Sequence, residues 1–193
     1  MATELIKKIE FPHDRFEIRL SGSGGQGMIL ASVIMSEAIG KDPDKNVVQT
    51  QSYGPEARGG ASKADVVVSE NEISYPKAMQ LDLLLCMTQE SMDTYYKFLK
   101  DTGTLVIDDS LVTEVPTDEY YGLPFTRLAK EEVGHVMVAN VIALGAIACL
   151  TGVVSKERLI EAVLARAPRG TEDKNRKAVD IGFAEAEKMK SES

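Results

Sequence analysis

The sequence has 193 residues, a formal net charge of −8 at pH 7, and 44% hydrophobic residues. This length and apolar content are enough for a single domain with a core of ordinary size. The acidic surplus argues against a nucleic-acid partner, because binding to phosphates requires a basic surface.

The N-terminus, residues 1–14, mixes charges with few apolar residues and is expected to form an extension to a single domain over residues 15–190. Because it lacks the apolar core of a signal peptide, we expect a cytoplasmic protein. Alternating apolar residues predict a strand over residues 15–20, followed by a glycine-rich loop and a helix over residues 28–39. Further strands are predicted at residues 46–49, 64–69, 81–87 and 104–107, with a helix at residues 89–100 between the last two.

The last third of the chain changes to helices, which we predict at residues 138–150, 155–166 and 172–190. The apolar stretch 136–150 is shorter than the ~20 residues that cross a bilayer, so it predicts a buried helix and no membrane span. Since strands and helices alternate up to Asp109, the sequence predicts an α/β fold with a Rossmann-like, doubly wound, mostly parallel sheet and a helical C-terminal portion.

The loop after the first strand contains the motif G-x-G-x-x-G at Gly22, Gly24 and Gly27, with Gly25 and Gln26 inside it. Glycines at such a turn permit positive φ and close approach of a ligand or of another backbone. The N–H groups at the start of the following helix can then bind an anion. We expect Gly24 to need positive φ or the close approach of a ligand or another backbone. A β-branched residue at this position should therefore strongly reduce stability and assembly.

A dinucleotide site would also need an acidic residue at the end of the second strand, where it bonds the ribose. That place holds Gln49, Thr50 and Gln51, and the nearest arginine, Arg58, comes several residues later. An independent enzyme that binds NAD(P) or flavin is therefore an alternative interpretation. A loop that only makes a tight turn is another.

The segment QSYGPEARGGA, residues 51–61, combines Tyr53, Glu56, Arg58, Gly59 and Gly60 in one polar loop. Loops with such residues usually carry function, and an arginine there can bind a carboxylate or phosphate through two hydrogen bonds. We expect this loop beside the glycine loop, because both follow strands of the same sheet. Its neighbour could be a ligand or a subunit, and the alternative is a surface turn with an internal pair between Glu56 and Arg58.

Other polar residues are weaker candidates. Asp108 and Asp109 end a predicted strand, where they could face a crevice or cap the following turn. Cys86 and Cys149 are far apart in the sequence, which favours two reduced thiols in the core and no metal site. Tyr95 and Phe98 are interpreted as helix packing and surface amphipathicity.

Taken together, GSGGQG at residues 22–27 and the downstream QSYGPEARGGA resemble the gamma subunits of 2-oxoacid:ferredoxin oxidoreductases. The resemblance extends over residues 15–188 and includes the apolar helix that begins with VAN at residues 138–140. The loop sequence is most similar to that of the 2-oxoglutarate or branched-chain enzymes.

This resemblance implies oxidative decarboxylation of a 2-oxoacid, capture of the acyl group by coenzyme A, and electron transfer to ferredoxin or a similar acceptor. It also implies that thiamine diphosphate, Mg²⁺ and the iron–sulfur clusters lie in partner chains, namely the alpha and beta subunits and a ferredoxin-like delta subunit. This chain is expected to hold no cofactor alone, and no catalytic residue is assigned. A purely architectural subunit is a third alternative.

Overall fold

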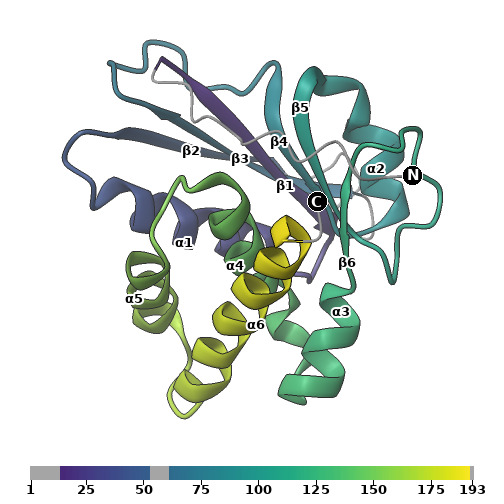
Figure 1. Cartoon of the computed structure of the whole chain (residues 1–193). Coiled ribbons are helices and arrows are strands. Elements are labelled where there is room, and N and C mark those ends of the chain that lie inside the picture. The colour runs from purple at the N-terminus through teal and green to yellow at the C-terminus, as the bar shows by residue number, and fades with distance from the viewer. Residues whose placement is uncertain (1–13, 53–60, 192–193) are drawn as a thin grey trace.

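The structure, a computed structural model, describes residues 14–52 and 61–191. Its centre is a six-stranded sheet in the order β2-β3-β1-β4-β5-β6 (Figure 1). The strands are β1 (Phe16–Ser23), β2 (Asn46–Ser52), β3 (Ala61–Ser69), β4 (Leu81–Cys86), β5 (Leu99–Asp108) and β6 (Tyr121–Leu123). Three neighbouring pairs are parallel and two are antiparallel, which confirms the predicted mostly parallel α/β sheet.

One strand departs from the doubly wound pattern, because β3 runs antiparallel to both of its neighbours, β1 and β2. The physical reason is the connection between β2 and β3. It holds only residues 53–60, whereas a parallel crossover needs a dozen or more residues. Since β1 and β2 are both antiparallel to β3, they run in the same direction, and β3 starts at the edge of the sheet where β1 and β2 end. We call this the carboxyl edge of the sheet.

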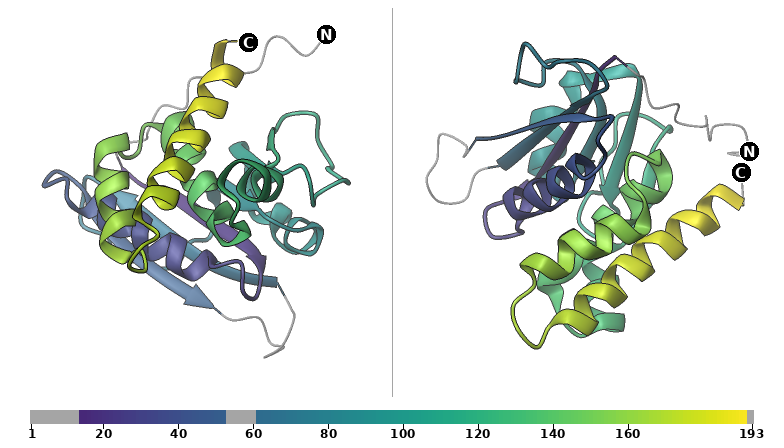
Figure 2. Two further views of the ribbon diagram at one scale, coloured as in Figure 1. Left: turned by 90° about the horizontal axis from the view of Figure 1, so that it is seen from below. Right: turned by 90° about the vertical axis from the view of Figure 1, so that its left-hand side faces the viewer.

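Helices cover both faces of the sheet. Along the chain they are α1 (Met28–Gly40), α2 (Gln89–Tyr95), η1 (Tyr96–Phe98), α3 (Phe125–Leu128), the π-helix η2 (Ala129–Val133), η3 (Val136–Val138), α4 (Ala139–Thr151), α5 (Lys156–Arg166) and α6 (Glu172–Ser191). Helices α1, α4, α5 and α6 pack on one face, and α2 packs on the other (Figure 1, Figure 2). The predicted helix 89–100 is too long, because Leu99 already pairs with Leu81 in the sheet.

Alternating side chains fill the two layers of the core. In β3, Val66 and Val68 pack toward α1, whereas Val67 packs toward α2. In β4, Leu83 and Leu84 divide in the same way. Burial of both faces explains why these strands read as continuous apolar runs.

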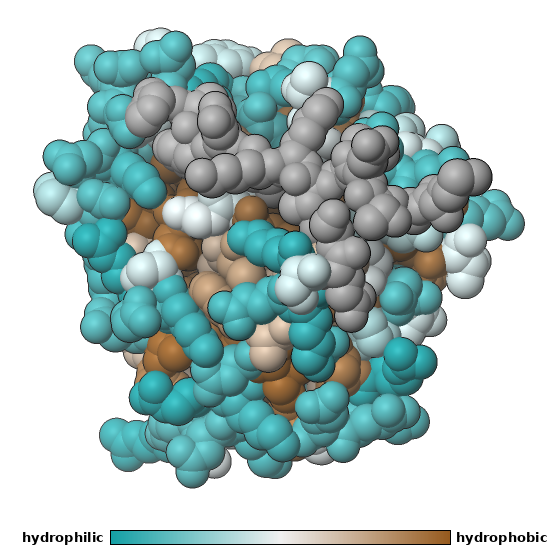
Figure 3. Space-filling model, viewed as in Figure 1, coloured by the Kyte–Doolittle hydropathy of each residue, from teal (hydrophilic) through white to brown (hydrophobic). Residues whose placement is uncertain are grey.

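Helix α4 is buried almost all round, as predicted for the long apolar stretch. It ends at Gly152, which has left-handed backbone angles (φ 65°) and so allows the chain to leave the helix. Within the described part of the chain, no helix has both the length and the apolar character needed to cross a membrane. The helical face of the molecule is mostly hydrophilic, with separate apolar patches between the polar side chains (Figure 3).

On the α2 side, β1 carries polar residues that are nevertheless buried. Arg19 is only 2% exposed and forms two hydrogen bonds with Asp65 of β3, at 2.7 and 2.8 Å. Its guanidinium carbon lies 5.2 Å from the ring centroids of both Tyr95 and Phe98. Tyr95 is buried, in agreement with the predicted helix packing, whereas Phe98 is partly buried. Both rings lie against a buried cation, which the sequence interpretation did not include.

Candidate functional site

The glycine loop turns the chain from β1 into α1 at the carboxyl edge. Gln26 stabilises this turn, because its Oε1 accepts a hydrogen bond from Ser23 N at 2.8 Å and its Nε2 donates to Met87 O at 3.4 Å. A side chain at Gly22 would overlap with Gln26 Oε1 and lie 3.1 Å from Met87 Cβ. Gln26 and Gly22 thus serve the geometry of the loop itself.

The remaining glycines of the loop divide into two kinds. Gly25 (φ 96°) and Gly27 (φ 73°) adopt left-handed backbone angles that favour glycine. Gly24 has no positive φ, is exposed, and a Cβ placed on it would meet nothing within 4 Å among the residues that the structure describes. The expectation that Gly24 needs positive φ is therefore wrong, whereas close approach of a ligand or of another chain stays a prediction. Its surroundings leave room for an approaching molecule.

Helix α1 begins at this loop, and the first turn of α4 lies beside it. The N-cap of α1 is Gly27 and that of α4 is Val138, and neither cap makes a side-chain hydrogen bond to its helix. Asn140 in the first turn of α4 joins the two, since its Nδ2 donates to Gly27 O at 3.2 Å. The first N–H groups of a helix have no partner inside the helix, so the uncapped start of α1 favours an anion or a hydrogen-bond acceptor. In α4 the first N–H, that of Ala139, already donates to Val136 O of η3.

Asn140 is a residue whose role the sequence did not reveal. It is 5% exposed, and its Oδ1 has no hydrogen-bond partner among the described residues. A side chain at Gly27 would lie 2.5 Å from Asn140 Nδ2. The contact spans 113 residues of sequence, so only the fold brings the motif VAN and the glycine loop together.

The polar loop begins and ends beside the glycine loop. Ser23, the last residue of β1, pairs with Ala61, the first residue of β3, and Ser52 at the end of β2 pairs with Lys63. The strand ends that flank the polar loop therefore lie at the carboxyl edge. The polar-loop candidates themselves lie outside the described residues: Tyr53, Glu56, Arg58, Gly59 and Gly60.

The arrangement of strands disfavours a Rossmann dinucleotide site. In that site the second strand neighbours the first, so that its terminal acid reaches the ribose. Here β3 separates β2 from β1, which places the end of β2 two strand spacings, or about 10 Å, from β1. Gln49 of β2 instead donates a hydrogen bond to Ser32 Oγ of α1 at 2.9 Å.

Asp108 and Asp109 differ in role. Asp108 is fully buried and accepts hydrogen bonds from the backbone N–H groups of Ser110 and Thr126, at 3.1 and 2.9 Å. It therefore fixes the turn after β5 and the start of α3. Burial raises the pKa of Asp109, and the neighbouring Asp108 raises it further, while Arg127 opposes the shift.

Neither cysteine is suited to be a nucleophile. Burial raises the pKa of the Cys86 thiol to about 12, so that it stays protonated near neutral pH. Cys149 was predicted to be a core thiol but is only partly buried, and burial again raises its pKa. Among the described residues, no group of three or more His, Cys, Asp or Glu side chains is placed to hold a metal ion.

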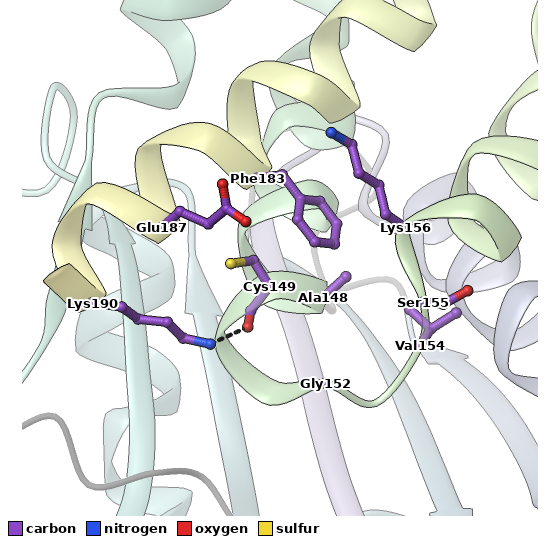
Figure 4. A pocket seen from close by; sticks show the side chains of 9 residues that line it. All are labelled: Ala148, Cys149, Gly152, Val154, Ser155, Lys156, Phe183, Glu187 and Lys190. Atoms are coloured by element: carbon purple, nitrogen blue, oxygen red, sulfur yellow. Dashed lines mark hydrogen bonds between the residues drawn. The ribbon is translucent and has the colours of Figure 1, made fainter.

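Cys149 lines a cavity of about 440 Å³ between α4, α5 and α6 (Figure 4). Its two lysines are already engaged: Lys190 donates to Cys149 O at 2.5 Å, and Lys156 lies 2.8 Å from the Asp180 carboxylate. The cavity lies toward the opposite end of α4 from Asn140, about 13 Å along the helix axis. It is separate from the carboxyl edge.

Comparison with known proteins places this geometry in a family. Residues 17–185 match the family model described as pyruvate ferredoxin/flavodoxin oxidoreductase. The chain belongs to this family. The resemblance to gamma subunits of 2-oxoacid:ferredoxin oxidoreductases, predicted from the two loops, is thereby confirmed.

Individual relatives agree with the family assignment. The chain is 46% identical to the 2-oxoglutarate synthase subunit KorC of Methanocaldococcus jannaschii, over 91% of this chain and 96% of that protein. The gamma subunit of a keto/oxoacid ferredoxin oxidoreductase from Geobacter sulfurreducens has the same fold, with a TM-score of 0.82 and 48% identity over 90% of this chain and 97% of that one.

A third structure, a 2-oxoglutarate:ferredoxin oxidoreductase from Magnetococcus marinus with 2-oxoglutarate, coenzyme A and succinyl-CoA bound, shares the fold at 20% identity and a TM-score of 0.79. The match covers 92% of this chain but 32% of that chain. The family fold therefore occurs both as a separate chain and as one part of a longer polypeptide. The present chain is an enzyme subunit of this family.

Proposed function

We propose that the chain is the gamma subunit of a 2-oxoglutarate:ferredoxin oxidoreductase and that its carboxyl edge forms part of the approach for coenzyme A. The substrate class is supported by the similarity to KorC over nearly its whole length. The reaction would release carbon dioxide from 2-oxoglutarate, join the remaining acyl group to coenzyme A, and pass two electrons to ferredoxin or a similar acceptor.

The chain does not have the residues expected to bind the cofactors of this reaction. A cubane iron–sulfur cluster requires four cysteine ligands, and the whole sequence contains two. Thiamine diphosphate with Mg²⁺, which supplies the decarboxylation chemistry, and the clusters would thus be bound by alpha, beta and ferredoxin-like delta subunits. What this chain offers is a place to bind and orient a co-substrate.

The observation that carries the proposal is the free space at Gly24. The described part of the fold does not require a glycine there, because Gly24 has no positive φ and no close neighbour within residues 14–52 and 61–191. It stands four residues before the uncapped start of α1, where backbone N–H groups favour a phosphate. A phosphate of coenzyme A would suit this place, with Arg58 of the polar loop as a second proposed contact.

Replacing Gly24 by alanine tests this assignment. We expect roughly tenfold weaker binding of coenzyme A to the assembled complex, because the added methyl group occupies the space into which the ligand fits. The melting temperature of the isolated chain should not change, since the methyl group meets no atom of the described residues within 4 Å. Coenzyme A titration of turnover and thermal unfolding provide the two measurements.

Gly40→Ala is the matched control. Gly40 is also exposed, has no positive φ, and has nothing within 4 Å of its Cβ position, but it lies at the other end of α1. Unchanged coenzyme A affinity in Gly24→Ala would remove the loop from the ligand site. Loss of assembly without a change in affinity would instead favour an architectural role.

The isolated chain is expected to catalyse no oxidation of 2-oxoglutarate and to be colourless. The reason is that its sequence has too few cysteines for a cluster and lacks the G-D-G motif expected at a thiamine diphosphate site. Dye reduction with coenzyme A and 2-oxoglutarate, with the assembled complex as positive control, measures the activity. Turnover by the pure chain, or a visible absorption band of a flavin or cluster, would contradict the proposal.

A further inference from the structure

Three exposed apolar side chains lie close in sequence to the contact between the two helix starts. Leu30 of α1 is 45% exposed, and Val136 and Met137 of η3 are 50% and 55% exposed. Each lies within four residues of the hydrogen bond between Gly27 and Asn140, which holds the first turns of α1 and α4 together. We call Leu30, Val136 and Met137 the apolar patch.

The two chain segments that carry the apolar patch contain no charged residue. Neither residues 21–36 nor residues 136–155 contain an Asp, Glu, Lys or Arg, although 27% of the whole sequence is charged. The exposed members of these segments are glycine or apolar, including Gly24 and Gly25 of the loop, apart from Ser155 at the far end of residues 136–155. A surface that combines exposed apolar side chains with an absence of charge is typical of the centre of a protein interface.

The occupant follows from the longer chain that shares this fold. In the Magnetococcus polypeptide the fold makes up about a third of the chain, so the other two thirds are joined to it covalently. In KorC of Methanocaldococcus jannaschii and in the Geobacter gamma subunit the fold makes up nearly the whole chain, so any surface that would face the rest of such a polypeptide is left for a separate subunit. A coenzyme A bound at the glycine loop must also meet the thiamine centre, which this chain lacks.

We infer that the apolar patch binds the subunit that corresponds to the remaining two thirds of the longer chain, so that the glycine loop lies at the border between the two chains. The partner surface is apolar and uncharged, as the patch is. This inference rests on the proposed function for the position of the reacting centre. The apolar patch itself does not depend on which ligand the loop binds.

The test is to place a lysine in the apolar patch and to measure assembly. Met137→Lys is expected to weaken association of the gamma subunit with the rest of the complex by roughly tenfold or more, because it places a charge at a desolvated contact. Met79→Lys is the matched control: Met79 is 58% exposed but precedes β4, at the opposite edge of the sheet. It should leave association within about twofold of wild type.

Association is measured by titrating the purified gamma variant into complex that lacks this subunit, with the melting temperature of each isolated variant recorded. If Met137→Lys unfolds the chain, Leu30→Lys on the outer face of α1 is used instead, and its association with the rest of the complex is measured in the same assay. Wild-type association of the patch variants, or a larger loss with Met79→Lys, would overturn the inference. If Met137→Lys abolishes association while Gly24→Ala leaves coenzyme A affinity unchanged, the interface stands and only the coenzyme A proposal fails.

Discussion

Gly182→Ala is expected to destabilise the chain by about 2–3 kcal/mol, because it adds a methyl group where two helix backbones touch. Gly182 of α6 faces α4 so closely that an alanine Cβ would overlap with the carbonyl oxygen of Ile142 and lie 2.9 Å from Ala146 N. Gly145 of α4 makes the reciprocal contact, where a Cβ would lie 2.5 Å from Val179 O. The obstructing atoms belong to the backbone, so they cannot rotate away as a side chain could.

The measurement is thermal unfolding of the isolated chain, in which this loss corresponds to a decrease of roughly 4–12 °C for a domain of this size. Gly40→Ala serves as control, since it is the same substitution in a helix without any neighbour within 4 Å. It should leave stability unchanged or raise it by about 0.5–1 kcal/mol through helix propensity. Equal melting temperatures for Gly182→Ala and wild type would show that α4 and α6 are not packed this closely.

Most of the sheet could be predicted from the sequence because its strands are buried on both faces. Val66 to Val68 and Leu83 to Leu85 form short apolar runs that suit a covered strand. The direction of β3 was missed, although one signal was available: residues 53–60 leave no room for a crossover helix. Strand β6 (Tyr121–Leu123) was missed because three residues with only one fully apolar side chain give no periodicity to detect.

The candidate site was predictable only in its local parts. The glycine motif indicated a turn between β1 and α1, and the structure confirms that turn, but the motif could not show which glycine is held by packing and which is free. That difference depends on Gln26, Met87 and Asn140, which contact Gly22 and Gly27. Two of these three come from distant parts of the sequence. Site assignments for the polar loop, including Tyr53 and Arg58, stay predictions.

The same limit applies to the buried cation of β1. Alternation in residues 16–20 shows that Phe16, Ile18 and Leu20 share one face, and it leaves Arg19 on the other. Nothing local indicates that α2 and η1 cover this second face or that Asp65 lies opposite Arg19 in the sheet. Pairing between distant strands decides whether a charge is solvated or buried. The pattern of apolar and polar residues along the sequence does not contain this information.

Asp65→Ala is therefore expected to cost about 3–5 kcal/mol of unfolding free energy, since it leaves the Arg19 guanidinium buried without a counter-charge. Arginine cannot lose its proton to avoid this cost. The rings of Tyr95 and Phe98 offset part of it by cation–π contact, at 5.2 Å each. Lys63 Nζ, 3.6 Å from Asp65 Oδ2, is 28% exposed and can be solvated when the carboxylate is removed.

Urea unfolding of two single variants and one double variant separates the buried charge from simple loss of packing. Arg19→Met keeps an apolar side chain between the two rings, and in Arg19→Met with Asp65→Ala no charge of the original pair remains. We expect the double variant to be more stable than Asp65→Ala alone, because replacing a buried ion pair by apolar groups is often close to neutral, whereas removing one partner is not. If Asp65→Ala costs less than about 1 kcal/mol, or if the two single losses simply add, the pair behaves like an exposed one. Arg19 would then have to reach solvent during normal fluctuations of α2.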